Sequence, residues 1–217
     1  MNFARFGNES PEYRKIRDEL QHAEIALREQ REQVAALRRR LPLDHVVEDL
    51  VFRELRGSQP EEVKLSELFR KRDRPLVLMQ FMFGKKQTSP CPMCSMWADG
   101  YNAVMKHLTQ HVNFAVLIAG DVSEFQAFAD ERGWSNLHVV SAGDTTLKSD
   151  LGFEAPDGAQ IPGVSVFQLA PDGRVVHFYS QSAMLDGGGR GMDVLSPVWN
   201  YLDLTPEGRA DWLPRLG

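Results

Sequence analysis

The sequence predicts a mixed α/β domain, with helices flanking a central β-sheet, that follows a long N-terminal helix. From residue 75 onward, short apolar segments typical of buried strands alternate with amphipathic segments typical of helices. A β-hairpin is predicted at 161–181, with its turn at Pro171-Asp172-Gly173. Residues 10–41, in contrast, are densely charged and repeat apolar residues at heptad spacing, which is typical of a long helix.

Composition narrows the class of protein. The chain has 217 residues, a formal net charge of −5, 42% hydrophobic and 25% charged residues, which is ordinary for a folded globular protein. No apolar run approaches the roughly 20 residues of a membrane-spanning helix, and the N-terminus lacks the apolar core of a signal peptide. Neither half of the chain has the basic excess of a nucleic-acid binder. We therefore expect a cytoplasmic protein that binds neither nucleic acid nor membrane.

We expect residues 1–41 to form an amphipathic helical arm and residues 42–217 to form the α/β domain. Ser10 suits the N-cap and Pro11 the first helical position, and Pro42 ends the helix. The heptad positions are occupied by Ile16, Leu20, Ala23, Leu27, Gln30, Val34, Leu37 and Leu41. This seam predicts either a homodimer through residues 10–41 or a helix packed along its own domain.

The domain reads as a series of short elements. A strand or hairpin arm at 45–55 and a turn at 57–60 precede a strand that runs into a helical turn at 63–69. The buried strand 75–83 leads to a helix at 91–111, with Ala103, Val104, His107 and Leu108 on its inward face. A strand at 113–120, a helix at 122–132, a strand at 136–142, the hairpin, a loop at 186–191 and a helix over about 192–202 complete the order.

Cys91 and Cys94, the only cysteines, fall where the buried strand gives way to the helix. A CxxC pair in a cytosolic α/β chain indicates redox chemistry. The free N–H groups and the dipole of a helix N-terminus stabilise a thiolate, so Cys91 is the predicted nucleophile and Cys94 closes a disulfide with it. Pro92 takes the first helical position, where its missing N–H costs nothing.

Other roles of this pair are less favoured. A zinc site needs about four ligands, a single CxxC supplies two, and the histidines do not stand at ligand spacing from it. We expect no metal and no cofactor other than the redox-active disulfide Cys91–Cys94. Two inert buried thiols are the other alternative.

The order strand–CxxC–helix–strand–helix–strand–hairpin–helix is that of a thioredoxin fold. The segments PLVLMQFMFG, CPMCSMWADG, VSEFQAFADERGW, PGVSVFQLAPDGRVVHFYS and YLDLTPEGR resemble a bacterial thioredoxin-like family of unknown function. That family is related to the alkyl hydroperoxide reductase/thiol-specific antioxidant superfamily. The resemblance implies a thioredoxin fold with an N-terminal β extension, as in peroxiredoxins.

The resemblance also suggests supporting residues. Thr88 stands three residues before Cys91, as in peroxiredoxins, but Gly84 occupies the position of their proline. No arginine lies within 161–166, and Arg174 and Arg190 are the nearest candidates. Thioredoxin folds place a cis-proline opposite the CxxC, and Pro162 is the candidate here.

We expect a thiol–disulfide oxidoreductase that acts on a protein or small-molecule disulfide or thiol through Cys91 and Cys94. Trp97, one turn after Cys94, would shield the disulfide or contact substrate if it is not simply part of the core. The alternatives are a thiol peroxidase of peroxiredoxin type and a non-enzymatic, dimeric thioredoxin-like adaptor or redox sensor.

Overall fold

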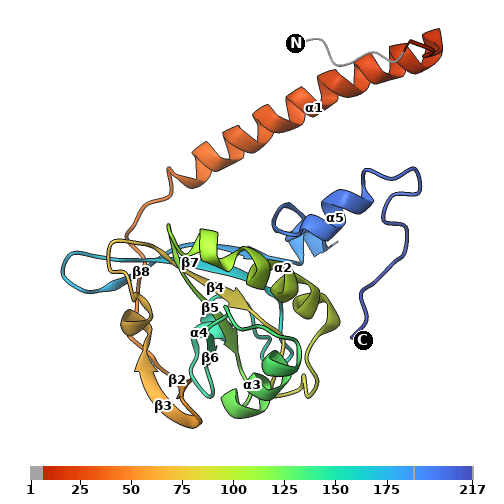
Figure 1. Ribbon diagram of the computed structural model, residues 1–217. Helices are drawn as coiled ribbons and strands as arrows, with labels where there is room; N and C mark the ends of the chain where they lie inside the picture. The colour runs from red at the N-terminus through yellow and green to blue at the C-terminus, as the bar shows by residue number, and fades with distance from the viewer. Residues whose placement is uncertain (1–6, 188, 217) are drawn as a thin grey trace. The chain divides into compact units, whose positions relative to one another are not determined.

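The computed structural model describes residues 7–187 and 189–216 and divides the chain into two compact units, Met1–Pro42 and Leu43–Gly217. The first unit consists mainly of helix α1 (Pro11–Arg38), which has no buried residue (Figure 1). Its N-terminus is capped as predicted, because the backbone N–H of Tyr13 donates to Ser10 Oγ at 3.1 Å. The helix ends at Arg38 rather than Leu41, so Leu41 lies beyond its last turn.

The second unit is built on one eight-stranded sheet (Figure 1). In chain order the strands are β1 (Val46–Val47), β2 (Val51–Arg56), β3 (Gln59–Lys64), β4 (Leu76–Gln80), β5 (Asn113–Ile118), β6 (Val139–Ser141), β7 (Gly163–Leu169) and β8 (Val175–Ser182). The spatial order is β1-β8-β7-β4-β5-β6-β2-β3. The helices are α2 (Pro92–Leu108), α3 (Val122–Glu131), α4 (Leu147–Asp150) and α5 (Pro197–Leu202), with 3-10 turns η1 (Leu65–Leu68), η2 (Leu185–Gly187) and η3 (Asp193–Leu195).

This topology is the thioredoxin-like fold that the sequence predicts. β4, β5 and β6 are parallel and are connected through α2 and α3, while the β7–β8 hairpin pairs antiparallel with β4. The β2–β3 hairpin extends the sheet beyond β6, and this is the expected N-terminal β extension. The described residues contain no helix that is both long and apolar enough to cross a membrane.

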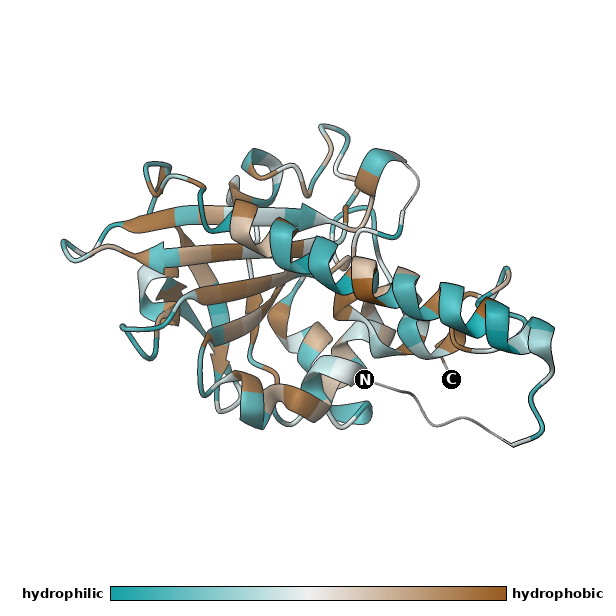
Figure 2. Cartoon of the chain, turned by 90° about the horizontal axis from the view of Figure 1, so that it is seen from above, coloured by the Kyte–Doolittle hydropathy of each residue, from teal (hydrophilic) through white to brown (hydrophobic). Residues whose placement is uncertain are grey.

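The sheet separates two hydrophobic cores. Along β4 and the residue after it, Met79 and Phe81 belong to the core that α2 and α3 cover, whereas Leu76 and Leu78 belong to the core that includes η1 and Leu147 of α4. Strands buried on both faces are apolar almost throughout, which explains why their sequence signal is strong. Figure 2 shows the contrast between these mostly hydrophobic strands and the mostly hydrophilic α1.

The inward face of α2 differs from the predicted one. Trp97, Ala98, Tyr101 and Met105 are buried, whereas Val104 is 48% exposed. Ala103 and His107 are exposed as well, and Leu108 is half-buried. The buried positions continue the stripe that begins at Cys94 with steps of three and four residues, as the helical period requires. The predicted stripe is the neighbouring one and is therefore rotated around the helix relative to the buried face.

The predicted C-terminal helix over about 192–202 is interrupted. It divides into η3 and α5 because Pro197 lacks the N–H that a continuous helix would use, and Ser196 before it is extended at φ −114° and ψ 112°. Pro197 instead occupies the first position of a new helix.

Two glycines should respond in opposite directions to substitution by alanine. A Cβ on Gly100, inside α2, would meet only Pro197 at 3.7 Å, so Gly100→Ala should raise the free energy of unfolding by about 0.5–1 kcal/mol. A Cβ on Gly84, at φ +101°, would lie 2.0 Å from the Gly120 backbone nitrogen, so Gly84→Ala should lower it. Urea unfolding of both variants checks this; stabilisation by Gly84→Ala would contradict the close approach of the two loops.

Candidate active site

Cys91 is the N-cap residue of α2, and Pro92 takes the first helical position as predicted. The backbone N–H of Cys91 donates to the Met82 carbonyl at 3.3 Å, just beyond the end of β4. The Cys91 carbonyl accepts from both the backbone N–H and the Oγ of Ser95, at 2.9 and 3.0 Å. The cysteine backbone is thus held between the strand end and the first helical turn, while its side chain stays partly accessible.

The environment of Cys91 favours its thiolate. A hydrogen bond from the Cys94 thiol lowers the pKa of Cys91 from 9.0 to about 6, against the opposing effect of burial. The backbone N–H groups of Cys94 and Met93 act in the same direction, as expected at a helix N-terminus. Lys85 and Lys86, the nearest cations along the sequence, instead pair with Glu154 and Asp157.

Cys94 has the opposite character. It is completely buried, and burial together with the neighbouring Cys91 raises the pKa of Cys94 well above its usual value. The pair therefore combines one accessible sulfur that ionises below neutral pH with one buried sulfur that keeps its proton. This division suits a nucleophilic thiolate and a second thiol that reacts later.

A buried lysine interacts electrostatically with the second cysteine of this pair. Lys148 is 1% exposed, and its Nζ donates to Gln80 Oε1 at 3.2 Å and to the Phe81 carbonyl at 3.4 Å. Gln80 in turn donates to Ser165 Oγ at 3.1 Å. Burial lowers the pKa of Lys148 to about 7, partly offset by attraction to Cys94. At neutral pH a large fraction of Lys148 is thus an uncharged amine that can accept a proton.

Sequence reasoning missed Lys148. It sits in the polar segment TTLKSD, which resembles an exposed loop, and buried lysines are rare. The one sequence signal for a buried polar partner is Gln80, a polar residue inside the most apolar strand of the chain, which accepts a hydrogen bond from Lys148.

Cys91 opens into a cavity of about 810 Å³. The predicted residues Trp97 and Pro162 line this cavity with Cys91. Thr88 is exposed and is not among the described lining residues. No peptide bond of the described residues is cis, so Pro162 is trans. The cavity thus brings together Cys91, Trp97 and Pro162 and leaves Thr88 apart.

Arg174 and Gly84 also separate this site from the peroxiredoxin pattern. Arg174 pairs with Asp172 at the β7–β8 turn, whereas Arg190 lines the cavity and pairs with Asp193 at 2.7 Å. At Gly84, the positive φ and the close backbone of Gly120 exclude a proline. The departure from the peroxiredoxin pattern at Gly84 therefore has a steric cause.

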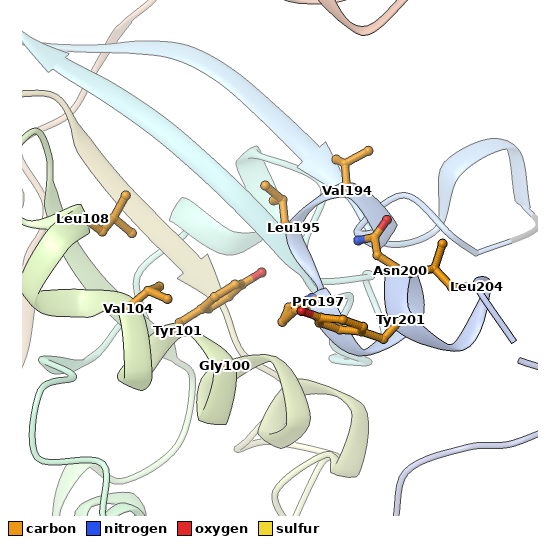
Figure 3. Close-up of a pocket in the computed structure, with 10 residues that line it drawn as sticks. All are labelled: Gly100, Tyr101, Val104, Leu108, Val194, Leu195, Pro197, Asn200, Tyr201 and Leu204. Carbon is orange, nitrogen blue, oxygen red and sulfur yellow. The ribbon is translucent and has the colours of Figure 1, made fainter. Parts of the chain in front are cut away.

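A second hollow, a groove of about 660 Å³ between α2 and the C-terminal helices, contains no cysteine (Figure 3). Tyr101 and Val104 contribute to it from α2, and Pro197 and Tyr201 from α5. Both cysteines lie outside it, and Cys91 lines the other cavity, so the cavity at Cys91 is the candidate active site. Among the described residues, no group of three or more His, Cys, Asp or Glu side chains is arranged to hold a metal ion.

Comparison with known proteins identifies the family. Residues 5–215 match the family described as "bacterial protein of unknown function (DUF899)". The chain belongs to this family. No curated protein matches the sequence.

Solved structures with a related fold include peroxiredoxins at low sequence identity. The mitochondrial 2-Cys peroxiredoxin of Plasmodium falciparum is 15% identical, with a TM-score of 0.49 over 75% of this chain and 95% of that one. A mutant of peroxiredoxin Q from Xanthomonas campestris is 16% identical, with a TM-score of 0.49 over 74% and 95%. A mutant PrxQ of Xylella fastidiosa is 18% identical, with a TM-score of 0.48 over 74% and 97%.

The pH dependence of alkylation should report the Cys91 thiolate. In the reduced protein, the rate constant for iodoacetamide should rise through a midpoint near pH 6 and level off above it, because only the thiolate reacts. Cys94→Ala removes the largest stabilising hydrogen bond, so its midpoint should move upward toward 9.0. Mass spectrometry of quenched samples measures both profiles, and identical midpoints would contradict the role of Cys94.

Proposed function

We propose that this protein is a thiol–disulfide oxidoreductase. The observation that carries the proposal is the pairing of Cys91, an N-cap thiol with a lowered pKa that opens into a cavity, with the buried Cys94 one turn further into α2. A redox reaction between two thiols and a disulfide needs one exposed thiolate and one thiol within reach of it.

The reaction proceeds in two exchanges. The Cys91 thiolate attacks one sulfur of a substrate disulfide, forms a mixed disulfide and releases the other half of the substrate as a thiolate. Cys94 then loses its proton and attacks Cys91 Sγ, which forms the Cys91–Cys94 disulfide and releases the second substrate thiolate. The substrate is reduced by two electrons, and a thiol reductant of the cell returns the protein to the dithiol. The reverse sequence oxidises a substrate dithiol.

Lys148 supports the second exchange in this proposal. The Cys94 thiol is buried and must lose its proton to react, and we propose that the uncharged amine of Lys148, which interacts electrostatically with Cys94, accepts it. Gln80 and the Phe81 carbonyl hold Nζ in place. The resulting ammonium and thiolate attract each other in a buried site, where charge interactions are stronger than in water.

Trapping of the mixed disulfide tests the proposed function. Cys94→Ser should accumulate a covalent adduct between Cys91 and half of the substrate disulfide, because the attack that releases it is missing. Cys91→Ser should form no adduct, since the remaining thiol is buried. Mass spectrometry after reaction with disulfide-bonded insulin or a small disulfide measures the adduct. Equal labelling of both variants would contradict the assignment.

The contribution of Lys148 should appear only in the second step. Lys148→Met should slow disulfide closure roughly 10- to 100-fold near pH 7 and shift its pH profile upward, with the first attack by Cys91 changed less than about twofold. Stopped-flow release of the two substrate thiols separates the steps. Lys106→Met, at an exposed position of α2, is the matched control. Equal slowing of both steps would indicate a structural role instead.

A thiol peroxidase is the second candidate, and the lowered pKa of Cys91 and the presence of Arg190 in the cavity favour it. In that case hydrogen peroxide would oxidise Cys91 to a sulfenic acid, which Cys94 would convert to the disulfide with loss of water. The exposed position of Thr88 and the pairing of Arg190 with Asp193 weigh against it. Peroxide consumption that depends on both Cys91 and Thr88 would favour this candidate over disulfide exchange.

We also propose that α1 mediates homodimerisation. Several of its seam residues are exposed, with Ile16 at 56%, Leu20 at 48% and Leu27 at 62%. An apolar heptad stripe of this kind is stabilised by a second helix. A dimer that lacks redox activity would correspond to the adaptor or redox-sensor alternative.

The dimer predicts a change of mass on disruption of the seam. The full chain should sediment as a dimer, whereas Leu20→Glu with Leu27→Glu should sediment as a monomer because it places charges in the seam. The matched control is Glu24→Gln with Arg28→Gln, at charged positions outside the heptad seam. Analytical ultracentrifugation compares them, and a monomeric full chain would contradict the proposal.

A further inference from the structure

We propose that the cavity beside Cys91 binds a small, uncharged disulfide with aliphatic or aromatic substituents, whose polar groups meet the Trp97 indole N–H and the Gln160 side-chain carbonyl. The inference rests on the proposed function and names the substrate class of the same site. It follows from the walls of the cavity, from two unpartnered polar atoms in them and from the balance of charges around them.

The walls are dominated by sulfur-containing and aromatic side chains. The methionines are Met82, Met93, Met184 and Met192. The tryptophans are Trp97, Trp199 and Trp212, and the rings of the last two pack edge to face with their centroids 5.5 Å apart. Methionine adapts to ligands of different shape, and aromatic rings offer large apolar contact areas. A volume of about 810 Å³ lies in the range of small-molecule sites.

Two buried polar atoms in this wall have no partner in the structure. They are the indole nitrogen of Trp97, which is 5% exposed, and Oε1 of Gln160, which is 6% exposed. The orientation of the Gln160 amide is set by its nitrogen, which donates to Glu154 Oε2 at 2.9 Å, so the carbonyl oxygen is the free atom. Trp97 and Gln160 both line the cavity, so a ligand whose acceptor and donor reach these two atoms satisfies both.

The charges around the cavity are already matched. Asp193 Oδ2 accepts from Arg190 at 2.7 Å and from Arg209 at 2.9 Å, and Arg209 also pairs with Asp203 at 2.5 Å. Arg209 lies over the Trp199 ring at 4.8 Å. Arg190 and Arg209 are the only cations among the described lining residues, and Asp211 adds a carboxylate. An anionic disulfide would therefore lose the hydration of its charge without gaining an ion pair. An uncharged disulfide has no charge to desolvate.

Two aromatic disulfides of different charge provide the experiment on the reduced full chain. They are 4,4′-dithiodipyridine, which is uncharged and has ring nitrogens that accept hydrogen bonds, and 5,5′-dithiobis(2-nitrobenzoate), a dianion. Stopped-flow rates are measured above the pKa of Cys91 and divided by the rates of a free thiol with the same probes. The uncharged probe should saturate and be favoured by about tenfold or more after this correction, whereas the dianion should react linearly with concentration.

Substitutions connect the preference to the cavity. Trp97→Phe keeps an aromatic ring but removes the N–H, so it should raise the half-saturation concentration of the uncharged probe about 3- to 10-fold with little change in limiting rate. The rate with the dianion should not change. Trp134→Phe is the matched control, because the Trp134 indole N–H bonds to Asp99 and does not line the cavity.

A non-reacting variant separates binding from chemistry. Cys91→Ser should bind 4,4′-dithiodipyridine, with a change in tryptophan fluorescence, and should not bind the dianion. Equal corrected rates for the two probes without saturation would overturn the substrate class but leave the proposed oxidoreductase function intact. A faster corrected reaction with disulfide-bonded insulin would have the same meaning. Failure of wild-type Cys91 to react with any of these disulfides would instead overturn the proposed function.

Discussion

The hydrogen bonds that converge on the Cys91 sulfur are the interaction on which the candidate site depends. They exist because Cys91 lies at the start of α2, after the loop that follows β4. The first backbone N–H groups of a helix have no hydrogen-bond partner within that helix. The Cys94 thiol is the strongest of these donors because a spacing of three residues returns it to the side of Cys91. The same geometry buries Cys94, so one structural feature creates both the reactive and the protected thiol.

A buried row of polar side chains adds a second level to this arrangement. Ser165, Gln80 and Lys148 form a hydrogen-bonded row between β7, β4 and α4 in an otherwise apolar core. A lysine is costly to bury, and the cost falls when its amine is uncharged and hydrogen-bonded. Its lowered pKa and its electrostatic interaction with Cys94 both follow from that burial. We interpret Lys148 as a proton acceptor because its partners position the amine without supplying a full negative charge.

Much of the fold follows directly from the sequence, and the exceptions have physical causes. Strands β4 and β5 are buried on both faces, so their apolar runs are unambiguous, and Ser10, Pro11, Cys91 and Pro92 mark helix starts by local chemistry. The face of α2 and the break before Pro197 depend on tertiary packing and on backbone conformation that periodicity does not resolve. Lys148 and Gln160 come from polar segments distant from the CxxC, and only the folded chain brings them to the site.

The central claim is that Cys91 and Cys94 form a reversible dithiol–disulfide couple. Equilibration of the full chain in dithiothreitol or glutathione buffers of graded potential, followed by acid quenching and mass spectrometry, measures it directly. The account predicts a single two-electron transition with a midpoint less negative than about −270 mV, the value of thioredoxin, because the lowered pKa of Cys91 stabilises the reduced form. Two cysteines that stay reduced at every potential would contradict it.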